Sequence, residues 1–294
     1  MTGEGLKMQP VNDADWDYLI VLDACRYDFF KENYTDFFEG ELSKKRTKGT
    51  STPEWLRKTF TSRYNYKYIS GNPYCNGKGV SLRDQMPGYE EDWNAVNSFT
   101  EVVDAWSTNW DKEENTVRPE SITEIALEED NGGKMIVHYI QPHRPYISCP
   151  EEAKVWDDNQ RVEAIAEEKE YEEEPSTKRK VIEGTRPYWS KFFWKLPYKT
   201  RWKIKDALGL ENPHWGALVQ KVGEDEVRDY YQQDLRMALE QVARLVEELD
   251  GKVIVTADHG EALGEHNDWG HQEESDNPKQ YTIPWLEMES VKSD

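Results

Sequence analysis

The chain has 294 residues, enough for one large α/β domain or two small ones. Its formal net charge of −21 argues against a general nucleic-acid binder, because phosphate backbones are held by clustered lysine and arginine side chains. Three widely spaced cysteines without a CxxC pair favour reduced thiols over a disulfide framework. No apolar signal-peptide core begins the sequence, and no window approaches the roughly 18 apolar residues of a membrane span. We therefore expect a cytoplasmic location.

The first expected elements lie near the amino-terminal end. Tyr18–Leu22 is a continuous apolar run ended by Asp23, which is typical of a central parallel strand with a polar residue at its carboxyl end. Such strand ends face ligand crevices in open α/β sheets. Further on, Thr52 and Pro53 predict the start of a helix, with Thr52 as N-cap and Pro53 at the first helical position.

Later segments alternate between strand and helix patterns. Further strands are expected at Tyr66–Ser70, Lys134–Ile140, Val253–Val255 and Thr282–Met288. Helices are expected at Ser121–Glu129 and at Glu224–Leu249, the second from apolar residues at helical spacing. This alternation predicts an α/β fold, a three-layer α/β/α sandwich with a mostly parallel central sheet.

A charged stretch at residues 150–222 interrupts the alternation, and we interpret it as an insertion within a single domain, residues 1–294. Glu151–Glu174 holds eleven acidic and three basic residues, whereas Lys178–Asp206 holds ten basic and two acidic residues and is rich in aromatics. One interpretation is a helical hairpin whose aromatic side chains pack on the body. The other is a surface, through 178–206, for a membrane headgroup layer, a glycan or another anionic partner. No pattern indicates an oligomeric state.

Histidines are unevenly distributed along the chain. Five of the six occur in two short segments, His138 and His143 in one and His259, His266 and His271 in the other. Strand ends can hold such ligands in fixed positions, and His143 and His259 each follow a predicted strand. Imidazoles mixed with carboxylates suit Zn²⁺ or Mn²⁺ better than Ca²⁺, which prefers oxygen ligands alone. We therefore expect one or two divalent ions, with Ca²⁺ less favoured.

Four segments together carry a resemblance to a known family. Asp258–His266, preceded by a strand and followed by Trp269–His271, resembles the carboxyl-terminal metal motif of the sulfatases and their alkaline-phosphatase-superfamily relatives. Leu22–Asp28 resembles the family's first strand end, where an Asp binds metal. Gln141–Tyr146 resembles its middle Pro-His-x-Pro segment, whose His contacts substrate or a second metal. The helix Tyr231–Leu249 matches the helix before its last metal-binding strand.

Departures from the family pattern distinguish its branches. Sulfatases mature a Cys or Ser within Cys/Ser-x-Pro-x-Arg into an aldehyde nucleophile, and that sequence does not occur here. Ser51 takes the nucleophile's place, but Trp55 replaces the Arg. Gly49–Thr52 instead resembles the Gly-Thr-x-Thr of phosphoethanolamine transferases, whose second Thr is a metal-bound nucleophile. Thr52 is then either that nucleophile or a simple capping residue.

Two further departures favour a transition-metal phosphoesterase over a Ca²⁺ sulfatase. Sulfatases usually pair two Asp residues at the first strand end, whereas Ala24 follows Asp23 here and removes one hard oxygen ligand. Where sulfatases place a sulfate-binding Lys, this chain has His271, as the phosphoethanolamine transferases do.

The resemblance implies a complete site. The residues expected to hold one divalent metal, with Thr52 as nucleophile, are Asp23, Thr52, Asp258 and His259. Those expected to hold a second metal or the substrate are His143, His271, His138 and His266. Arg26 and Arg144 are candidate contacts for the substrate anion.

The sequence thus predicts a metal-dependent hydrolase or transferase of phosphate or sulfate esters, with phosphoesters favoured. The alternatives are a true sulfatase and a catalytically weak binding module. The second is motivated by the short chain, which ends just after Met288 without the subdomain that sulfatases usually add.

Overall fold

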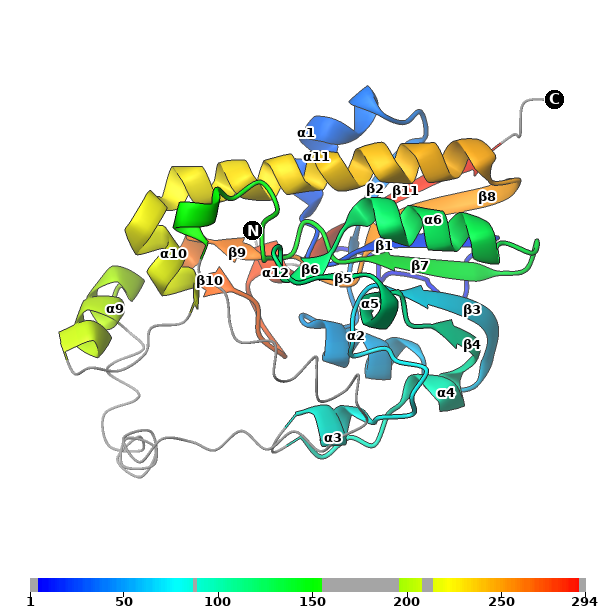
Figure 1. Ribbon diagram of the computed structural model, residues 1–294, viewed down its shortest axis with the longest axis horizontal. Helices are drawn as coiled ribbons and strands as arrows, with labels where there is room; N and C mark the ends of the chain where they lie inside the picture. Colours follow the sequence, from blue (N-terminus) through cyan, green and yellow to red (C-terminus); the bar gives the residue numbers. More distant parts are fainter. Residues whose placement is uncertain (1–4, 87–88, 155–195, 208–213, 291–294) are drawn as a thin grey trace.

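The computed structural model describes residues 5–86, 89–154, 196–207 and 214–290. Within them a seven-stranded sheet forms the centre, in the order β2-β11-β8-β1-β7-β3-β4 (Figure 1). The run from β8 to β4 is parallel, whereas β11 is antiparallel to both of its neighbours. The strands of this sheet are β1 (Tyr18–Leu22), β2 (Glu41–Arg46), β3 (Tyr64–Ser70), β4 (Phe99–Val103), β7 (Met135–Tyr139), β8 (Gly251–Ala257) and β11 (Thr282–Ser290).

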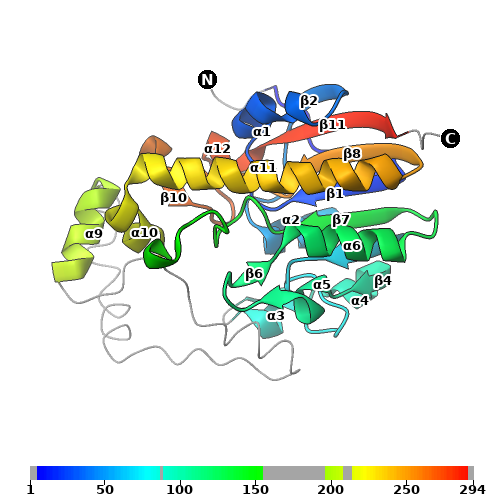
Figure 2. The ribbon, with the colours of Figure 1, turned by 45° about the horizontal axis from the view of Figure 1, so that its top comes forward.

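Helices cover both faces of the sheet. The long helix α11 (Glu224–Glu248) lies beside α6 (Pro119–Glu129) over one face, and α2 (Thr52–Thr59) lies on the other (Figure 2). The shorter helices are α1 (Tyr27–Asn33), α3 (Leu82–Gln85), α4 (Ala95–Ser98), α5 (Ala105–Thr108), α9 (Tyr198–Ala207), α10 (His214–Val222) and α12 (Pro278–Tyr281). Two small hairpins pair β5 (Trp110–Asp111) with β6 (Thr116–Val117) and β9 (Ala262–Leu263) with β10 (Trp269–Gly270). Single 3₁₀ turns occur at Tyr34–Asp36, Glu151–Ala153 and Glu265–Asn267.

The central strand β1 divides its side chains between two cores, as the alternating geometry of a strand requires. Tyr18, Ile20 and Leu22 join the core under α6 and α11. Leu19 and Val21 join the core under α2. Both faces of β1 are therefore buried, which accounts for its uninterrupted apolar sequence.

The predicted three-layer α/β/α class is confirmed, and the predicted strands and helices lie within two residues of their observed bounds. The direction of the last strand was not predicted: β11 runs antiparallel to β8. Its apolar pattern is the same for either direction, because the pattern records burial and not strand direction.

Part of the predicted insertion is described. Tyr198 and Trp202 on α9 are buried, and both of their rings contact Trp269 on β10. This contact agrees with the interpretation in which aromatic side chains of the stretch pack on the body. The rest of the basic segment, up to residue 195, lies outside the described residues, and its role as a membrane or glycan surface stays a prediction.

We expect Trp55→Ala to lower the free energy of unfolding by about 3–5 kcal/mol, the usual cost of truncating a large core aromatic. Trp55 is fully buried, meets the Phe60 ring edge-on and donates from Nε1 to Gln9 Oε1 at 2.8 Å. Urea unfolding would measure the change. Val96→Ala is the control, because Val96 is 37% exposed; an equal loss in both variants would contradict this account of the core.

Candidate metal centre

The ends of β1 and β8 bring two carboxylates together. Leu22 on β1 is paired in register with Ala257 on β8, so Asp23 and Asp258 leave the sheet side by side. Thr52, at the start of α2, places its Oγ1 between them: it donates to Asp258 Oδ2 at 2.7 Å and lies 3.5 Å from Asp23 Oδ2. His259 Nε2 completes the set, 3.4 Å from Thr52 Oγ1 and 3.6 Å from Asp23 Oδ1. We name Asp23, Thr52, Asp258 and His259 the central group.

Hydrogen bonds orient each member of the central group. Asp258 Oδ1 accepts the backbone N–H groups of Ala24 and His259 at 3.1 and 2.8 Å, which leaves Oδ2 to face Thr52. His259 Nδ1 donates to the Gly260 carbonyl at 2.9 Å, so its Nε2 lone pair faces the carboxylates. These contacts are the outer support that orients ligands in metal sites.

The central group has the properties of a cation site. All four side chains are buried, and Asp23 Oδ1 has no hydrogen-bond partner among the described residues. Burial and the charge of Asp258 raise the pKa of Asp23 well above its ordinary value, because two adjacent buried carboxylates repel. A divalent cation would relieve that repulsion. Two carboxylates, one imidazole and one hydroxyl are donors that suit Zn²⁺ or Mn²⁺.

A second set of ligands lies beside the first. Nitrogen and oxygen atoms of His143, Glu261 and His271 lie within 4.8 Å of one another. We name these three residues the outer group. His271 Nδ1 contacts Glu261 Oε1 at 3.0 Å, while Glu261 Oε2 is buried without a hydrogen-bond partner in the described part of the chain. The centres of the His259 and His271 rings are 4.2 Å apart, so the two groups adjoin.

The pKa values of the two histidines in the outer group are shifted in opposite directions. Burial lowers the pKa of His143 well below its usual value, and the neighbouring His271 lowers it further. Burial also acts to lower the pKa of His271, but the charge and hydrogen bond of Glu261 outweigh it and raise that pKa. His143 donates from Nδ1 to the Arg144 carbonyl. Its Nε2 therefore keeps a lone pair for a cation.

Two predicted ligands lie elsewhere. His138 is fully buried on β7, where its Nδ1 shares a 2.7 Å hydrogen bond with the Tyr68 hydroxyl and its Nε2 lies 3.9 Å from Asp258 Oδ2. It therefore stands behind the central group and outside the outer group. His266 is exposed in the turn Glu265–Asn267 and belongs to neither group.

The two candidate arginines differ. Arg26 is buried, and its guanidinium pairs with Asp28 at 2.7 Å and Glu265 at 2.8 Å. This speaks against the predicted contact with a substrate anion, because two carboxylates already engage the charge. Arg144 follows His143 and lies over the Trp215 ring, 5.5 Å from its centre, and its charge contributes to lowering the pKa of His143. It therefore stands near the outer group.

The prediction that Thr52 caps α2 is wrong. Ser51 is the N-cap: its backbone is extended and its Oγ accepts the Glu54 N–H at 3.3 Å. Thr52 is the first helical residue and Pro53 the second. Because Ser51 caps the helix, the Thr52 hydroxyl faces the other members of the central group.

Two residues of the site were not among the predicted ligands. Asn72, just beyond the end of β3, donates from Nδ2 to Asp23 Oδ2 at 2.7 Å. Its position after a strand end, like that of Asp23, was the available signal. Glu261 lies two residues after His259 within the recognised motif, yet only the turn after β8 shows that its side chain meets His271.

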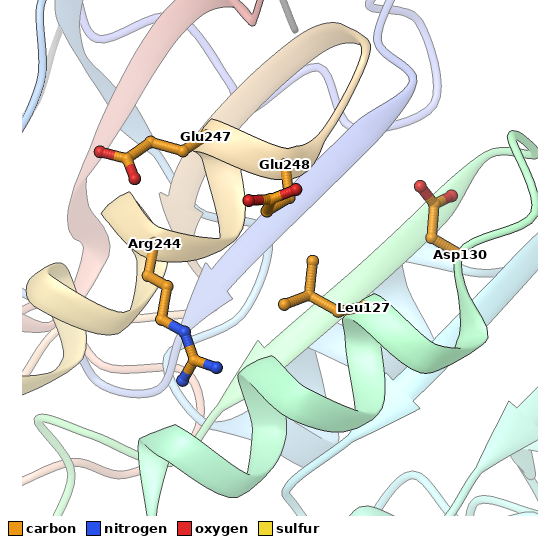
Figure 3. Close-up of a pocket in the computed structure, with 5 residues that line it drawn as sticks. All are labelled: Leu127, Asp130, Arg244, Glu247 and Glu248. Carbon is orange, nitrogen blue, oxygen red and sulfur yellow. The ribbon is translucent and has the colours of Figure 1, made fainter.

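The surface pocket between α6 and α11 is separate from both groups. Leu127, Asp130, Arg244, Glu247 and Glu248 line it (Figure 3). These residues end the helices that precede β7 and β8, so the pocket lies at the amino ends of those strands, opposite the ligands.

The chain belongs to the Sulfatase family, whose model matches residues 27–288. No curated protein matches significantly. The fold is similar to that of a proposed sulfatase from Bacteroides thetaiotaomicron, at 12% identity and a TM-score of 0.50 over 99% of this chain and 66% of that one. At this identity the likeness concerns the fold alone.

Two phosphoethanolamine transferase structures also match. The zinc complex of the periplasmic domain of EptC from Escherichia coli has 13% identity and a TM-score of 0.49, over 95% of this chain and 74% of that one. The integral membrane protein EptA from Neisseria meningitidis has 12% identity and a TM-score of 0.45, over 99% of this chain. The chain spans about half of that protein, 49%.

The predicted cytoplasmic location is wrong on this comparison. Matching structures include periplasmic domains of phosphoethanolamine transferases from Escherichia coli and Campylobacter jejuni. Among the described helices, none has the length and apolar character needed to cross a membrane.

We expect Gly260→Ala to weaken binding of Zn²⁺ or Mn²⁺ by about 10-fold or more, the usual result of disturbing the support of metal ligands. A Cβ at Gly260 would lie 2.2 Å from the Lys279 carbonyl oxygen, so the turn holding His259 and Glu261 must shift. Isothermal titration would measure the affinity. Gly133→Ala is the control, because its Cβ would meet only the Asn131 side chain; equal affinities in the two variants would contradict the prediction.

Proposed function

We propose that this chain is a metal-dependent phosphoester hydrolase or phosphotransferase with Thr52 as its nucleophile. The observation that carries the proposal is the position of Thr52 Oγ1, hydrogen-bonded to Asp258 Oδ2 at 2.7 Å and within 3.5 Å of Asp23 and His259. A hydroxyl used only for packing or capping has no reason to face two buried carboxylates and an imidazole.

Asp23, Asp258, His259 and Thr52 itself would hold a Zn²⁺ or Mn²⁺ ion. Such an ion, when bound, would supply Lewis acidity that lowers the pKa of the Thr52 hydroxyl. His143, Glu261 and His271 would hold a second ion or the non-bridging oxygens of the substrate. Asn72 would keep Asp23 aimed at the central group through its 2.7 Å hydrogen bond.

In the reaction, Thr52 Oγ1 would form a bond to phosphorus while the bond from phosphorus to the ester oxygen breaks. The proton lost by Thr52 would end on the departing alcohol. Water or an acceptor alcohol would then take the phosphoryl group and restore the Thr52 hydroxyl. The dipole of α2 would stabilise negative charge at the amino end of the helix. Not every backbone N–H there is free, because Pro53 has none and the Glu54 N–H donates to Ser51 Oγ.

A true sulfatase is the second candidate. The match to the Sulfatase family model favours it. The absence of a Cys/Ser-x-Pro-x-Arg sequence and the presence of His271 weigh against it. Mass spectrometry of the peptide holding Ser51 and Thr52 after exposure to substrate separates the two, since phosphothreonine supports our proposal and an aldehyde-derived residue at Ser51 supports a sulfatase.

We expect Thr52→Ala to lose at least about 10³-fold in turnover of an aryl phosphate with Zn²⁺ or Mn²⁺, because the attacking oxygen is gone. Ser51→Ala is a matched control, since it removes the neighbouring hydroxyl, with its cap of α2 and its 3.4 Å hydrogen bond to Glu273 Oε1. Loss of the cap costs about 1 kcal/mol of stability. Initial rates with aryl phosphate, phosphodiester, phosphonate and sulfate esters would also rank the substrates. Retained turnover in Thr52→Ala would refute the nucleophile.

Metal content decides between an enzyme and a catalytically weak binding module. We expect the purified protein to contain stoichiometric divalent metal and its melting temperature to fall when a chelator removes it, because a ligand bound to the folded state stabilises it. Asp258→Asn should weaken both effects, because it disables the central group. Elemental analysis without divalent metal, together with no gain in melting temperature on adding Zn²⁺ or Mn²⁺, would favour the binding module.

A further inference from the structure

Helix α11 carries three polar side chains at three-residue spacing that all point to the metal centre's end of the sheet. They are Arg228, Tyr231 and Asp234, and residues spaced in this way lie on one side of a helix. Tyr231 and Asp234 are completely buried. Each of the three side chains hydrogen-bonds to the backbone of a different loop.

Tyr231 holds the turn that follows β1. Its hydroxyl donates to the Ala24 carbonyl at 2.7 Å and accepts the Arg26 N–H at 2.9 Å. Ala24 has a φ of 59°, a backbone conformation that a non-glycine residue keeps only when its surroundings enforce it. The N–H of the same Ala24 binds Asp258 Oδ1. The Tyr231 hydroxyl therefore restrains the turn that follows Asp23, and the Ala24 N–H of that turn binds Asp258.

Asp234 holds the loop that follows β7. Its two carboxylate oxygens accept the N–H groups of Ile147 and Ser148 at 2.8 and 2.9 Å. This loop carries His143 of the outer group. Burial raises the pKa of Asp234 to about 6, so keeping this carboxyl here carries an energetic cost at neutral pH. A buried carboxyl that carries this cost and accepts two backbone hydrogen bonds from one loop fits a role in positioning that loop.

Arg228 holds the loop that follows β8. Its Nε and Nη2 both donate to the Leu263 carbonyl, at 3.0 and 2.8 Å. Leu263 comes two residues after Glu261 and eight before His271, so this contact lies within the segment that links members of the two groups.

From these contacts we infer that α11 positions the metal centre: Tyr231 places the central group, Asp234 places His143, and Arg228 secures the loop of His259 and Glu261. The inference rests on the proposed function, because it assigns these side chains to that site. The three loops come from distant parts of the chain, and one rigid helix sets their separation. Tyr231, Asp234 and Arg228 are thus positioning residues that do not touch the substrate.

The test pairs Tyr231→Phe with Asp234→Asn. Tyr231→Phe keeps the ring that packs on Phe29 and removes both hydrogen bonds of the hydroxyl. Asp234→Asn keeps the shape and replaces one acceptor oxygen with a donor. Tyr230→Phe is the control, because it deletes the adjacent hydroxyl, which has no hydrogen bond to the described residues.

Amide hydrogen exchange is the first measurement. We expect Tyr231→Phe to speed exchange in the peptide covering 22–27 and to leave 145–149 unchanged, and Asp234→Asn to do the reverse. Exchange that accelerates equally in both peptides, or that matches in Tyr230→Phe, would overturn the inference, since it would mark general destabilisation. This readout needs neither metal nor activity, so it decides the bracing of the loops even if the proposed function fails.

Metal affinity is the second measurement. His271→Ala disables the outer group, and in that background zinc titration reports on the central group. There we expect Tyr231→Phe to weaken Zn²⁺ binding by about 10-fold and Asp234→Asn to change it by less than about 2-fold. Equal weakening by both would overturn the separate roles. No zinc binding in His271→Ala with intact α11 would count against the proposed function itself.

Discussion

The structure depends on two carboxylates that are buried side by side where β1 and β8 end. In-register pairing of the two strands puts Asp23 next to Asp258. Neither can reach solvent, so their repulsion has to be met within the protein. Hydrogen bonds from Asn72, Thr52 and backbone N–H groups meet part of it, and Asp23 Oδ1 stays without a partner among the described residues. A divalent cation at this point is the natural complement of that arrangement.

The neighbouring helices and turns position side chains around the two carboxylates. Helix α2 begins with the Thr52 hydroxyl facing them because Ser51 takes over the capping. The turn after β8 folds back so that Glu261 and His271 meet beside His259. Helix α11 binds the backbone of the surrounding loops from the opposite side. The result is a two-part set of candidate ligands at the carboxyl ends of parallel strands, the place where α/β folds commonly bind ligands.

Sequence patterns predicted several of the residues that the structure brings together, because they follow strongly apolar strands. Asp23, Asp258 and His259 could be placed from the end of an apolar run, and Thr52 and His143 from local motifs. Patterns failed where a side chain's partner lies far away in the sequence. His138 and His143 look alike in sequence. In the structure, however, His138 hydrogen-bonds to Tyr68, whereas His143 lies beside Glu261 and His271. Arg26 looked like an anion contact until the fold placed Glu265 beside it.

By itself the sequence determined the α/β class, five strands of the central sheet and the helices α6 and α11 to within two residues, and the residues able to ligate a metal, because apolar periodicity and residue chemistry are local properties. It missed β2 and β4, which lie at the two edges of the sheet. Tertiary structure decided which ligands share a group, which serine or threonine caps α2, the direction of β11, and the anchoring of three loops by one helix. Those outcomes depend on strand register and on contacts between distant segments. The contacts of Ala24 with Tyr231 and Asp258, for example, join residues 207 and 234 positions apart. No local pattern records such contacts.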